Sequence, residues 1–361
     1  MSSPRSQNSP KTRSLAGSPQ PLEGNEQPPG TGSVHPTSTQ IPFNEADDDD
    51  DDDDEAVFGV EDDESFISTT ASLSESIFDY RNIHGRTFQR SKTTEYWGPN
   101  DDKQNEGLDI AHHFVTMLKG DRLFEAPIGA NPSKILDVGT GTGIWAIDVA
   151  DAYPSAEVIG TDISPIQPAW VPPNCKFHID DAQLEWTYPP ETFDFVHIRG
   201  LYCSIDNWTE LYRQAYKVLL PGGWIEDCEF NITLYSDIPA VKNDPEHIFK
   251  QWAKVFFEAP DRMGKTARIG LEGSMRKHME EAGFVDILEK SNQVPIGGWS
   301  SDPKLKQIGL YNLAFLDQSL EGFALFMLKE IMEWGYAEIQ LFVARMRKAM
   351  RKAKIRPYYM V

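Results

Sequence analysis

The sequence predicts an α/β fold, a mostly parallel sheet with helices on both faces, and three observations carry this prediction. Apolar runs typical of buried strands recur along the chain, and helix-like patterns follow several of them. The first run stops at three glycines, and a helical pattern begins directly after the third. This strand–turn–helix order lets backbone N–H groups approach a ligand at a helix N-terminus. The runs cover residues 134–138, 157–162, 175–180 and 193–199.

The composition allows a large core in a reducing compartment. The chain has 361 residues, of which 40% are apolar and 11% aromatic, and its net charge is −22. The three cysteines lie far apart and form no Cys-x-x-Cys pair, which argues against a disulfide framework or a structural zinc site. No apolar stretch is long enough for a membrane span or a signal peptide, so we expect an intracellular protein without a membrane span.

Residues 1–74 are predicted to form a disordered acidic tail outside the fold. Ser, Pro, Gly, Gln and Asp dominate this segment, and residues 47–54 are an unbroken run of aspartates. Such a segment buries too little apolar surface to offset its conformational entropy. It is either a solubilising extension or a docking arm for basic partners.

Helical segments are expected before the first strand. Ser72-Leu73-Ser74-Glu75 fits a capping box. After an irregular, aromatic-rich stretch, residues 105–118 follow helical spacing. His112 lies on this helix, where it either faces the site or is an ordinary packed or solvated histidine. His112-His113 is not predicted to bind metal, because no acid or cysteine stands at ligand spacing.

The glycine turn and the acid that follows it are the main candidates for a binding site. The turn reads Asp137-Val138-Gly139-Thr140-Gly141-Thr142-Gly143, which differs from the Gly-x-Gly-x-x-Gly dinucleotide pattern. Asp162 closes the second apolar run, about 20 residues further on. An acid at such a strand end can accept hydrogen bonds from ribose hydroxyls. The alternative is a Rossmann-like unit that binds NAD or no ligand.

The third and fourth apolar runs also end in candidate residues. The third ends at Asp180-Asp181-Ala182, where an acid suits the amino group of adenine, although adjacent acids also fit a solvated loop. The fourth ends at Arg199, followed by Tyr202. Ligands bind outside the carboxyl ends of parallel strands, so both residues are well placed. His197 lies inside the strand and is predicted to be a core histidine.

The next helix and strand raise a question about two buried acids. A helix is predicted over 207–220, stopped by Pro221-Gly222-Gly223, and a strand follows at 224–230. Glu226 and Glu229 are unusual in such a strand, because an unpaired buried carboxylate is costly. Either they face the crevice or they pair with a base such as Arg199. Neither acid forms a clear general acid/base pair, so no catalytic residue is assigned.

The remaining third of the chain is predicted to be mainly helical. Seven of the twelve residues at 345–356 are Lys or Arg. In an acidic chain without a reading motif, this favours a solvated helix face over a nucleic-acid surface. The last strand is either short or incomplete. We expect helices at 268–282, 304–315 and 322–352, a sixth strand at 284–289 and a last strand at 355–361.

These motifs together resemble the class I S-adenosylmethionine-dependent methyltransferases. The resemblance rests on the Asp-x-Gly-x-Gly-x-Gly turn, on Asp162 and on the phrase Leu-x-Pro-Gly-Gly-Trp ending at Trp224. It implies one domain over 75–361, with cap helices at 75–130, a core at 131–361 and a seven-stranded sheet whose last strand is antiparallel. It also implies that S-adenosylmethionine contacts Asp137, Gly139, Gly141, Gly143, Asp162, Asp181 and Ala182, with Asp162 at the ribose and Asp181 and Ala182 at the adenine.

A narrower resemblance points to the fungal methyltransferases of the LaeA type. It is carried by Ser-Pro-Ile-Gln-Pro at 164–168, by Trp-Val-Pro-Pro-Asn-Cys at 170–175, and by Tyr96, Pro99, Asn100, Asp101, Leu108, Asp109 and His112. It implies a regulatory protein methyltransferase of fungal secondary metabolism or development, acting in a velvet-type complex in the nucleus and cytoplasm. The candidates for the acceptor side are His112, Arg199, Tyr202 and Glu229.

Two other functions remain open from the sequence. One is a biosynthetic O- or N-methyltransferase of a small metabolite, and the other is a partner-binding scaffold without catalysis. The intact glycines and Asp162 argue against a scaffold. The acidic tail favours the regulatory protein, because an enzyme for small molecules has no evident need of it.

Overall fold

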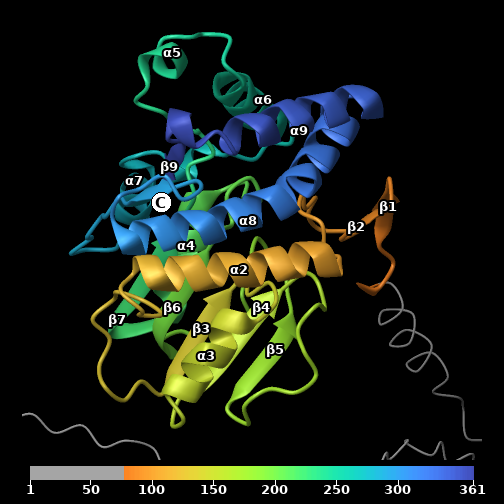
Figure 1. Cartoon of the computed structure of the whole chain (residues 1–361). Helices are drawn as coiled ribbons and strands as arrows, with labels where there is room; N and C mark the ends of the chain where they lie inside the picture. Colours follow the sequence, from red (N-terminus) through yellow and green to blue (C-terminus); the bar gives the residue numbers. More distant parts are fainter. Residues whose placement is uncertain (1–76) are drawn as a thin grey trace, which may run out of the picture. The chain divides into compact units, whose positions relative to one another are not determined.

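A parallel five-stranded sheet forms the centre of the structure (Figure 1). The computed structural model describes residues 77–361, so the predicted tail and the capping box at 72–75 lie outside the described residues. The sheet has the order β5-β4-β3-β6-β7. The order reverses beside β3, and ligands bind at such a reversal, outside the carboxyl ends of the strands. The strands are β3 (Lys134–Val138), β4 (Glu157–Asp162), β5 (Cys175–Ile179), β6 (Phe193–Arg199) and β7 (Leu219–Cys228).

Helices pack on both faces of this sheet, as predicted. On the face covered by α3, Trp145 and Val149 are buried together with Ile135. On the face covered by α4 and α7, Tyr212 is buried together with Leu136. Ile135 and Leu136 are neighbours in β3, so the alternation of a strand sends them to opposite faces. The helices are α2 (Asp102–Leu118), α3 (Ile144–Ala152), α4 (Trp208–Val218), α5 (Pro239–Lys242), α6 (Ile248–Arg262), α7 (Ser274–Ala282), α8 (Pro303–Phe326) and α9 (Tyr336–Met350).

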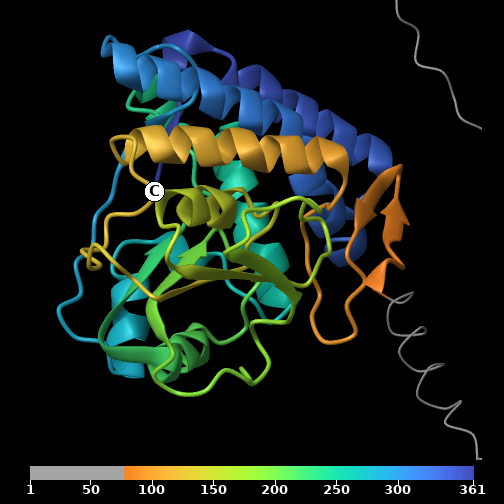
Figure 2. The same cartoon turned by 90° about the horizontal axis from the view of Figure 1, so that it is seen from below.

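A layer of long helices adjoins the sheet. α2 and α8 run side by side in both views (Figure 1, Figure 2). They approach closely because Gly107 has no side chain, and a Cβ atom there would lie 2.7 Å from Ser319 Oγ. α2, α6, α8 and α9 share one apolar core, which includes Phe114, Phe249 and Phe342. This layer forms a third core, separate from the two that cover the sheet.

A short hairpin precedes α2 in the chain. β1 (Arg81–Ile83) pairs antiparallel with β2 (Arg86–Phe88). The buried Arg86 guanidinium donates two hydrogen bonds to the carboxylate of Asp101. The same carboxylate caps α2 by accepting from the N–H of Gln104 at 3.0 Å. Between this hairpin and the first core strand, the described residues include the helix α2.

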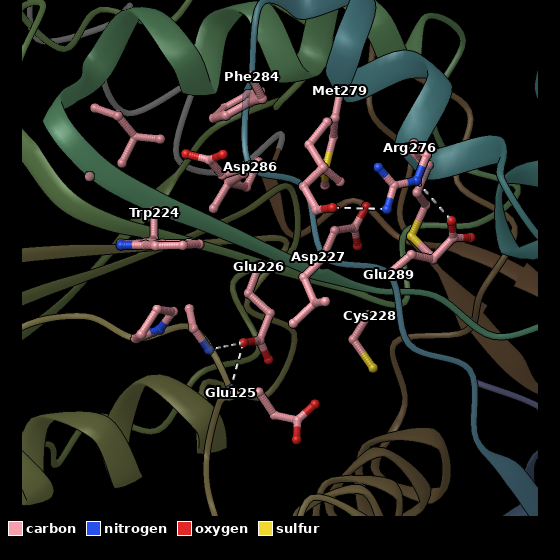
Figure 3. Close-up of a pocket in the computed structure, with 18 of the residues that line it drawn as sticks. Glu125, Trp224, Glu226, Asp227, Cys228, Arg276, Met279, Phe284, Asp286 and Glu289 are labelled. Carbon is pink, nitrogen blue, oxygen red and sulfur yellow. Dashed lines mark hydrogen bonds and ion pairs between the residues drawn. The ribbon is translucent and has the colours of Figure 1, made fainter.

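The central sheet has five strands instead of the predicted seven within residues 77–361. Residues 284–289 form no sixth strand, because their polar groups bind to α7 and its N-terminus. Arg276 donates to the carbonyl of Ile287 at 2.8 Å, and the Glu289 carboxylate accepts from the N–H of Gly273 at 2.7 Å. Asp286 has a φ of 54°, which interrupts an extended conformation. A groove of about 620 Å³ separates this segment from β7 (Figure 3).

In the C-terminal third, the boundaries of the helices and the pairing of the last strand differ from the prediction. β9 (Tyr358–Met360) is antiparallel, as expected, but it pairs with β8 (Gln293–Pro295) in a separate two-stranded sheet. Instead of separate helices at 304–315 and 322–352, α8 continues unbroken into a π-helical turn at Met327–Ile331. No helix among the described residues is long and apolar enough to cross a membrane.

Candidate functional site

A cavity of about 160 Å³ lies where the carboxyl ends of the parallel strands meet. The turn after β3, the ends of β4 and β6, and the helices α2 and α8 contribute to its wall. The larger groove beside β7 does not reach the glycine turn. Of the predicted site residues, Gly143 and Glu229 do not line the cavity, whereas it is lined by Asp137, Gly139, Gly141, Asp162, Asp181, Ala182, His112, Arg199 and Tyr202.

The glycine turn has a left-handed backbone at each of its three glycines. The φ angles are 69° at Gly139, 58° at Gly141 and 80° at Gly143, a region that favours glycine. A Cβ atom at Gly139 would lie 2.5 Å from Leu201 Cδ2. A Cβ atom at Gly141 would meet a single side chain, at 3.7 Å, so this position leaves room for a ligand. Gly143 instead packs against the ring of Phe177.

Asp162 ties the glycine turn to the loop after β4. Its Oδ2 accepts from the N–H of Gly141 at 2.9 Å, and its Oδ1 accepts from the N–H of Ser164 at 2.9 Å. Burial, with a smaller effect from the charge of Asp137, raises the pKa of Asp162 to about 6. Each carboxylate oxygen retains a second lone pair. Asp162 can therefore also accept hydrogen bonds from hydroxyl groups in the cavity.

Asp137 maintains the shape of the turn. Thr140 Oγ1 donates to Asp137 Oδ2 at 2.6 Å, and His197 Nδ1 lies 2.7 Å from Oδ1. Burial lowers the pKa of His197, so the ring is neutral and its Nδ1–H donates to the carboxylate. Trp145 stacks on the His197 ring at a centroid distance of 3.6 Å. His197 is 1% exposed and is thus the core histidine that the sequence predicts.

Asp181 presents an unpaired acceptor at the end of β5. Its Oδ1 accepts from the N–H of Gln183 at 3.0 Å, whereas the buried Oδ2 has no hydrogen-bond partner within residues 77–361. A buried acceptor without a donor is costly, so a donor on a ligand fits this position. Ala182 lines the same wall, and its carbonyl accepts from Trp186 Nε1 at 3.0 Å.

Arg199 is held at the cavity wall by a chain of hydrogen bonds. The chain runs through His112 on α2 to Asp148 on α3. The Arg199 guanidinium donates to His112 Nδ1 at 3.1 Å, and His112 Nε2 donates to Asp148 Oδ2 at 2.9 Å. Burial, followed by the charge of Arg199, lowers the pKa of His112 to about 4. The imidazole is therefore neutral, which leaves Nδ1 free to accept. His112 positions Arg199, and Arg199 offers a cation to an anionic group in the cavity.

Glu229 supports the site from behind. It is 2% exposed, and its carboxylate accepts from the N–H groups of Leu201 and Tyr202 at 2.8 and 2.9 Å. Burial, together with the charge of Asp227, raises the pKa of Glu229 well above its usual range. Glu229 therefore fixes the main chain that carries Tyr202.

Glu226 pairs with a base, which was one of the two alternatives expected from the sequence. The base is not Arg199. Lys119 Nζ donates to Glu226 Oε1 at 2.7 Å, and Arg199 takes no part. The N–H groups of Glu125 and Ala126 donate to Glu226 Oε2 at 2.6 and 2.7 Å. Burial alone would raise the pKa of Glu226, but Lys119, together with His197 and the N–H of Glu125, lowers it.

Sequence reasoning missed several residues of the site, including Asp148, Trp97 and Gln183. Asp148 lies on α3, 36 residues from His112, so no local pattern connects them. Trp97 lines the cavity and donates from Nε1 to the Tyr202 carbonyl at 3.3 Å. Gln183 also lines the cavity, and the only feature of the sequence that could have indicated this is its position next to Ala182. Among residues 77–361, no group of three or more His, Cys, Asp and Glu side chains is arranged to hold a metal ion.

A family model and several relatives of known name agree on the family to which this chain is similar. A family model described as a methyltransferase domain matches residues 111–289. Methyltransferase pytC of Aspergillus terreus is 36% identical over 286 residues, which cover 79% of this chain and 87% of the relative. Secondary metabolism regulator LAE1 of Cochliobolus heterostrophus is 34% identical over 282 residues, covering 76% and 90%. Secondary metabolism regulator laeA of Aspergillus fumigatus is 30% identical over 295 residues, covering 81% and 78%.

Solved structures are similar at a lower level. Phosphoethanolamine N-methyltransferase 2 of Haemonchus contortus, solved in complex with S-adenosyl-L-methionine, has a TM-score of 0.39 and 17% identity. The match covers 84% of this chain and 59% of that chain. The strand order β5-β4-β3-β6-β7 by itself defines the fold of this chain.

Proposed function

The chain belongs to the S-adenosylmethionine-dependent methyltransferases, in the group of the fungal LaeA-like proteins, and we propose that its cavity at the strand ends binds S-adenosylmethionine for methyl transfer. One observation carries the assignment of the site. The unpaired Oδ2 of Asp181 belongs to the same cavity as the Asp162 carboxylate and the open side of Gly141. On a single ligand, Asp181 would accept from an amino group and Asp162 from a pair of hydroxyls, while the main chain at Gly141 would allow the ligand to approach closely.

Each part of the cofactor has a suitable residue. Asp181 would accept from the adenine amino group, and Asp162 would accept from the ribose hydroxyls. Gly141 would lie beneath the ligand, where any side chain would intrude. Arg199 would pair with the carboxylate of the methionine portion, because it is the cation that His112 and Asp148 hold at the wall.

In the proposed methyl transfer, the protein acts mainly by positioning the reactants and not by acid–base catalysis. When bound, S-adenosylmethionine supplies an electrophilic methyl group on a sulfonium. The protein would hold an acceptor in line with that group and exclude water from both. The ring nitrogens of His112 are engaged by Arg199 and Asp148, so this histidine is not free to act as a base. No residue is therefore assigned as catalytic.

A regulatory role in secondary metabolism is the first candidate for the biology. It is supported by the relatives named as secondary metabolism regulators, at 34% and 30% identity. A velvet-type partner complex and a location in the nucleus and cytoplasm belong to this proposal. Fluorescence microscopy of the tagged chain and purification of the proteins bound to it would test both, and exclusion from the nucleus would contradict them.

A biosynthetic methyltransferase of a small metabolite is the second candidate. Two observations favour it: the relative at 36% identity is named only as a methyltransferase, and an apolar chamber adjoins the cofactor cavity. A regulatory role does not require a protein acceptor, so the chemistry of the acceptor alone does not separate the two candidates.

A labelled-methyl assay tests the proposed activity. Purified protein and S-adenosylmethionine with a tritiated methyl group would be added to a fungal extract. The extract would then be separated into precipitated protein and an organic phase. We expect label in one fraction with the wild type and none with Gly141→Val. Gly129→Ala is a matched control, because a Cβ atom at Gly129 would meet nothing within 4 Å. Absence of label in both fractions would contradict methyl transfer.

A further inference from the structure

A second, smaller cavity adjoins the proposed cofactor site. It has a volume of about 60 Å³ and shares with the cofactor cavity the side chains of Trp97, Tyr202, Phe230, Phe315 and Phe323. The space that these five residues share is called the junction, and the smaller cavity the acceptor chamber. Its far side is formed by α6 and α9, where Trp252 and Met346 contribute.

Aromatic rings dominate the walls of the acceptor chamber. The Trp97 ring lies 5.6 Å from the Tyr202 ring and 5.3 Å from the Phe323 ring, between centroids. Tyr202 and Phe230 are 6.0 Å apart by the same measure. Such tilted arrangements leave ring faces and edges available for another ring. The chamber therefore suits a flat, apolar occupant.

The described residues of the chamber offer no charged partner for an occupant. Within residues 77–361, its lining includes no Asp, Glu, His, Lys or Arg, and its titratable residues are Tyr202 and Tyr359. Burial is the main reason that the pKa values of both hydroxyls are raised, so both stay protonated. An ammonium group would lose its hydration here without a counter-ion, which is costly. Nearby rings would offset only part of that cost.

Tyr202 supplies a polar group at the junction. Its N–H is bound by Glu229 and its carbonyl accepts from Trp97, so its main chain is fixed. Its hydroxyl makes no hydrogen bond within the part of the chain that the structure describes. An acceptor oxygen at the junction can pair with this hydroxyl. The arrangement would direct an acceptor oxygen toward the cofactor cavity while a ring fills the chamber.

We propose, on the basis of the proposed methyltransferase function, that the methyl acceptor is a small, neutral aromatic compound with an acidic hydroxyl, of the phenol or enol class. In this reaction an oxygen lone pair forms the O–CH₃ bond, and the C–S bond breaks with its electron pair remaining on sulfur. The hydroxyl proton passes to bulk water. The acceptor must lose its proton easily, because the described residues that line the chamber include no base.

The proposal is tested with 4-methylphenol and tritiated S-adenosylmethionine. Transfer is measured as labelled 4-methylanisole in the organic phase, with a lysine-rich peptide as the competing acceptor. We expect saturable transfer to 4-methylphenol and none to the peptide. Label in the peptide, or no transfer to the phenol by a protein that binds S-adenosylmethionine, would overturn the proposal.

Substitutions at Met346 locate the acceptor. Met346 lines the acceptor chamber but not the cofactor cavity. Met346→Trp is expected to fill the chamber and to reduce transfer to 4-methylphenol about tenfold or more, a cost of about 1.4 kcal/mol. Met346→Leu conserves the volume and is expected to behave like the wild type. Tyr202→Phe keeps the ring and should reduce transfer by removing the hydroxyl.

Cofactor affinity separates the two proposals. The affinity for S-adenosylmethionine, measured by calorimetry, should stay near the wild-type value in Met346→Trp, because this residue does not line the cofactor cavity. Unchanged transfer in Met346→Trp would overturn the placement of the acceptor. Failure of the wild type to bind S-adenosylmethionine would instead refute the proposed function itself.

Discussion

Two glycines of the same turn are required for different physical reasons. Gly141 lines the cofactor cavity with little around it, whereas Gly143 lies against the ring of Phe177. The sequence predicts both as cofactor residues, because spacing alone does not distinguish a position under a ligand from a position under a side chain. Under the proposed assignment of the site, the motif Asp-x-Gly-x-Gly-x-Gly thus serves binding at Gly141 and packing at Gly143.

Gly141→Val is expected to abolish cofactor binding. A β-branched residue at a φ of 58° is strained, and its methyl groups would enter the cavity. We predict that the Kd for S-adenosylmethionine rises at least about 100-fold, or about 2.7 kcal/mol. Calorimetry measures this, and wild-type affinity in the variant would rule out this turn as the binding site.

Gly143→Ala is expected to act on stability instead. Its Cβ atom would overlap the Phe177 ring, and its φ of 80° is unfavourable for alanine. We expect a loss of about 1–3 kcal/mol in the free energy of unfolding. Urea unfolding provides the measurement. A variant as stable as the wild type would show that this contact is easily relaxed.

Asp162 should make cofactor binding depend on pH. Its pKa is raised to about 6, and the ionised carboxylate is the form that accepts two hydroxyl hydrogen bonds. Affinity should therefore be complete about one pH unit or more above this pKa and fall as the pH drops through it, by about tenfold per unit once the carboxyl is mostly protonated. Calorimetry between pH 5 and pH 8 measures this effect. Asp162→Asn should bind weakly and without this dependence, so an equal pH profile in both proteins would exclude Asp162 as the titrating group.

At the scale of elements, the strands of the sheet are the best predicted part. β4 and β6 coincide with the apolar runs at 157–162 and 193–199. Both are central in a parallel sheet, and strands covered on two faces are almost continuously apolar. The segment 284–289 has a similar pattern but remains outside the sheet, because Arg276 and Gly273 bind its polar groups. Those contacts depend on tertiary structure and leave no local signal.

Gly309 tests how closely α8 approaches the C-terminal sheet. Its carbonyl accepts from the N–H of Gly297 at 2.7 Å, and a Cβ atom on Gly309 would collide with the Gly297 carbonyl oxygen. A backbone atom cannot rotate away, so we expect Gly309→Ala to cost about 1–3 kcal/mol of unfolding free energy. Gly129→Ala, in open space, should change it by less than about 0.5 kcal/mol. Similar urea midpoints for the two variants would contradict this packing.

At the scale of the whole molecule, the sequence predicts the site better than the layers around it. The glycine turn, Asp162 and Asp181 follow strands that local patterns reveal, so their meeting at one edge is predictable. The layer formed by α2, α6, α8 and α9 and the Asp148–His112–Arg199 chain depend on contacts distant in sequence. Another contact distant in sequence involves the basic run at 345–356, where Arg351 pairs with Asp317 at 2.7 Å.

Removal of residues 1–74 should leave cofactor binding intact. Among the described residues, those that line the cofactor cavity lie between Thr94 and Phe323, within the single domain that we propose for residues 75–361. We expect the truncated and full-length proteins to bind S-adenosylmethionine with Kd values within about twofold, less than 0.5 kcal/mol. A larger loss in calorimetry would assign the removed segment a part in the site.

Calorimetric titration of the full-length protein with S-adenosylmethionine tests the central claim most directly. The wild type should bind one equivalent, and Asp162→Ala should lose most of this affinity, because the ribose hydroxyls lose their acceptor. Asp151→Ala removes an exposed carboxylate of α3 and should bind like the wild type. Absence of binding by the wild type, or equal binding by the Asp162 and Asp151 variants, would contradict a methyltransferase whose cofactor site lies at this turn.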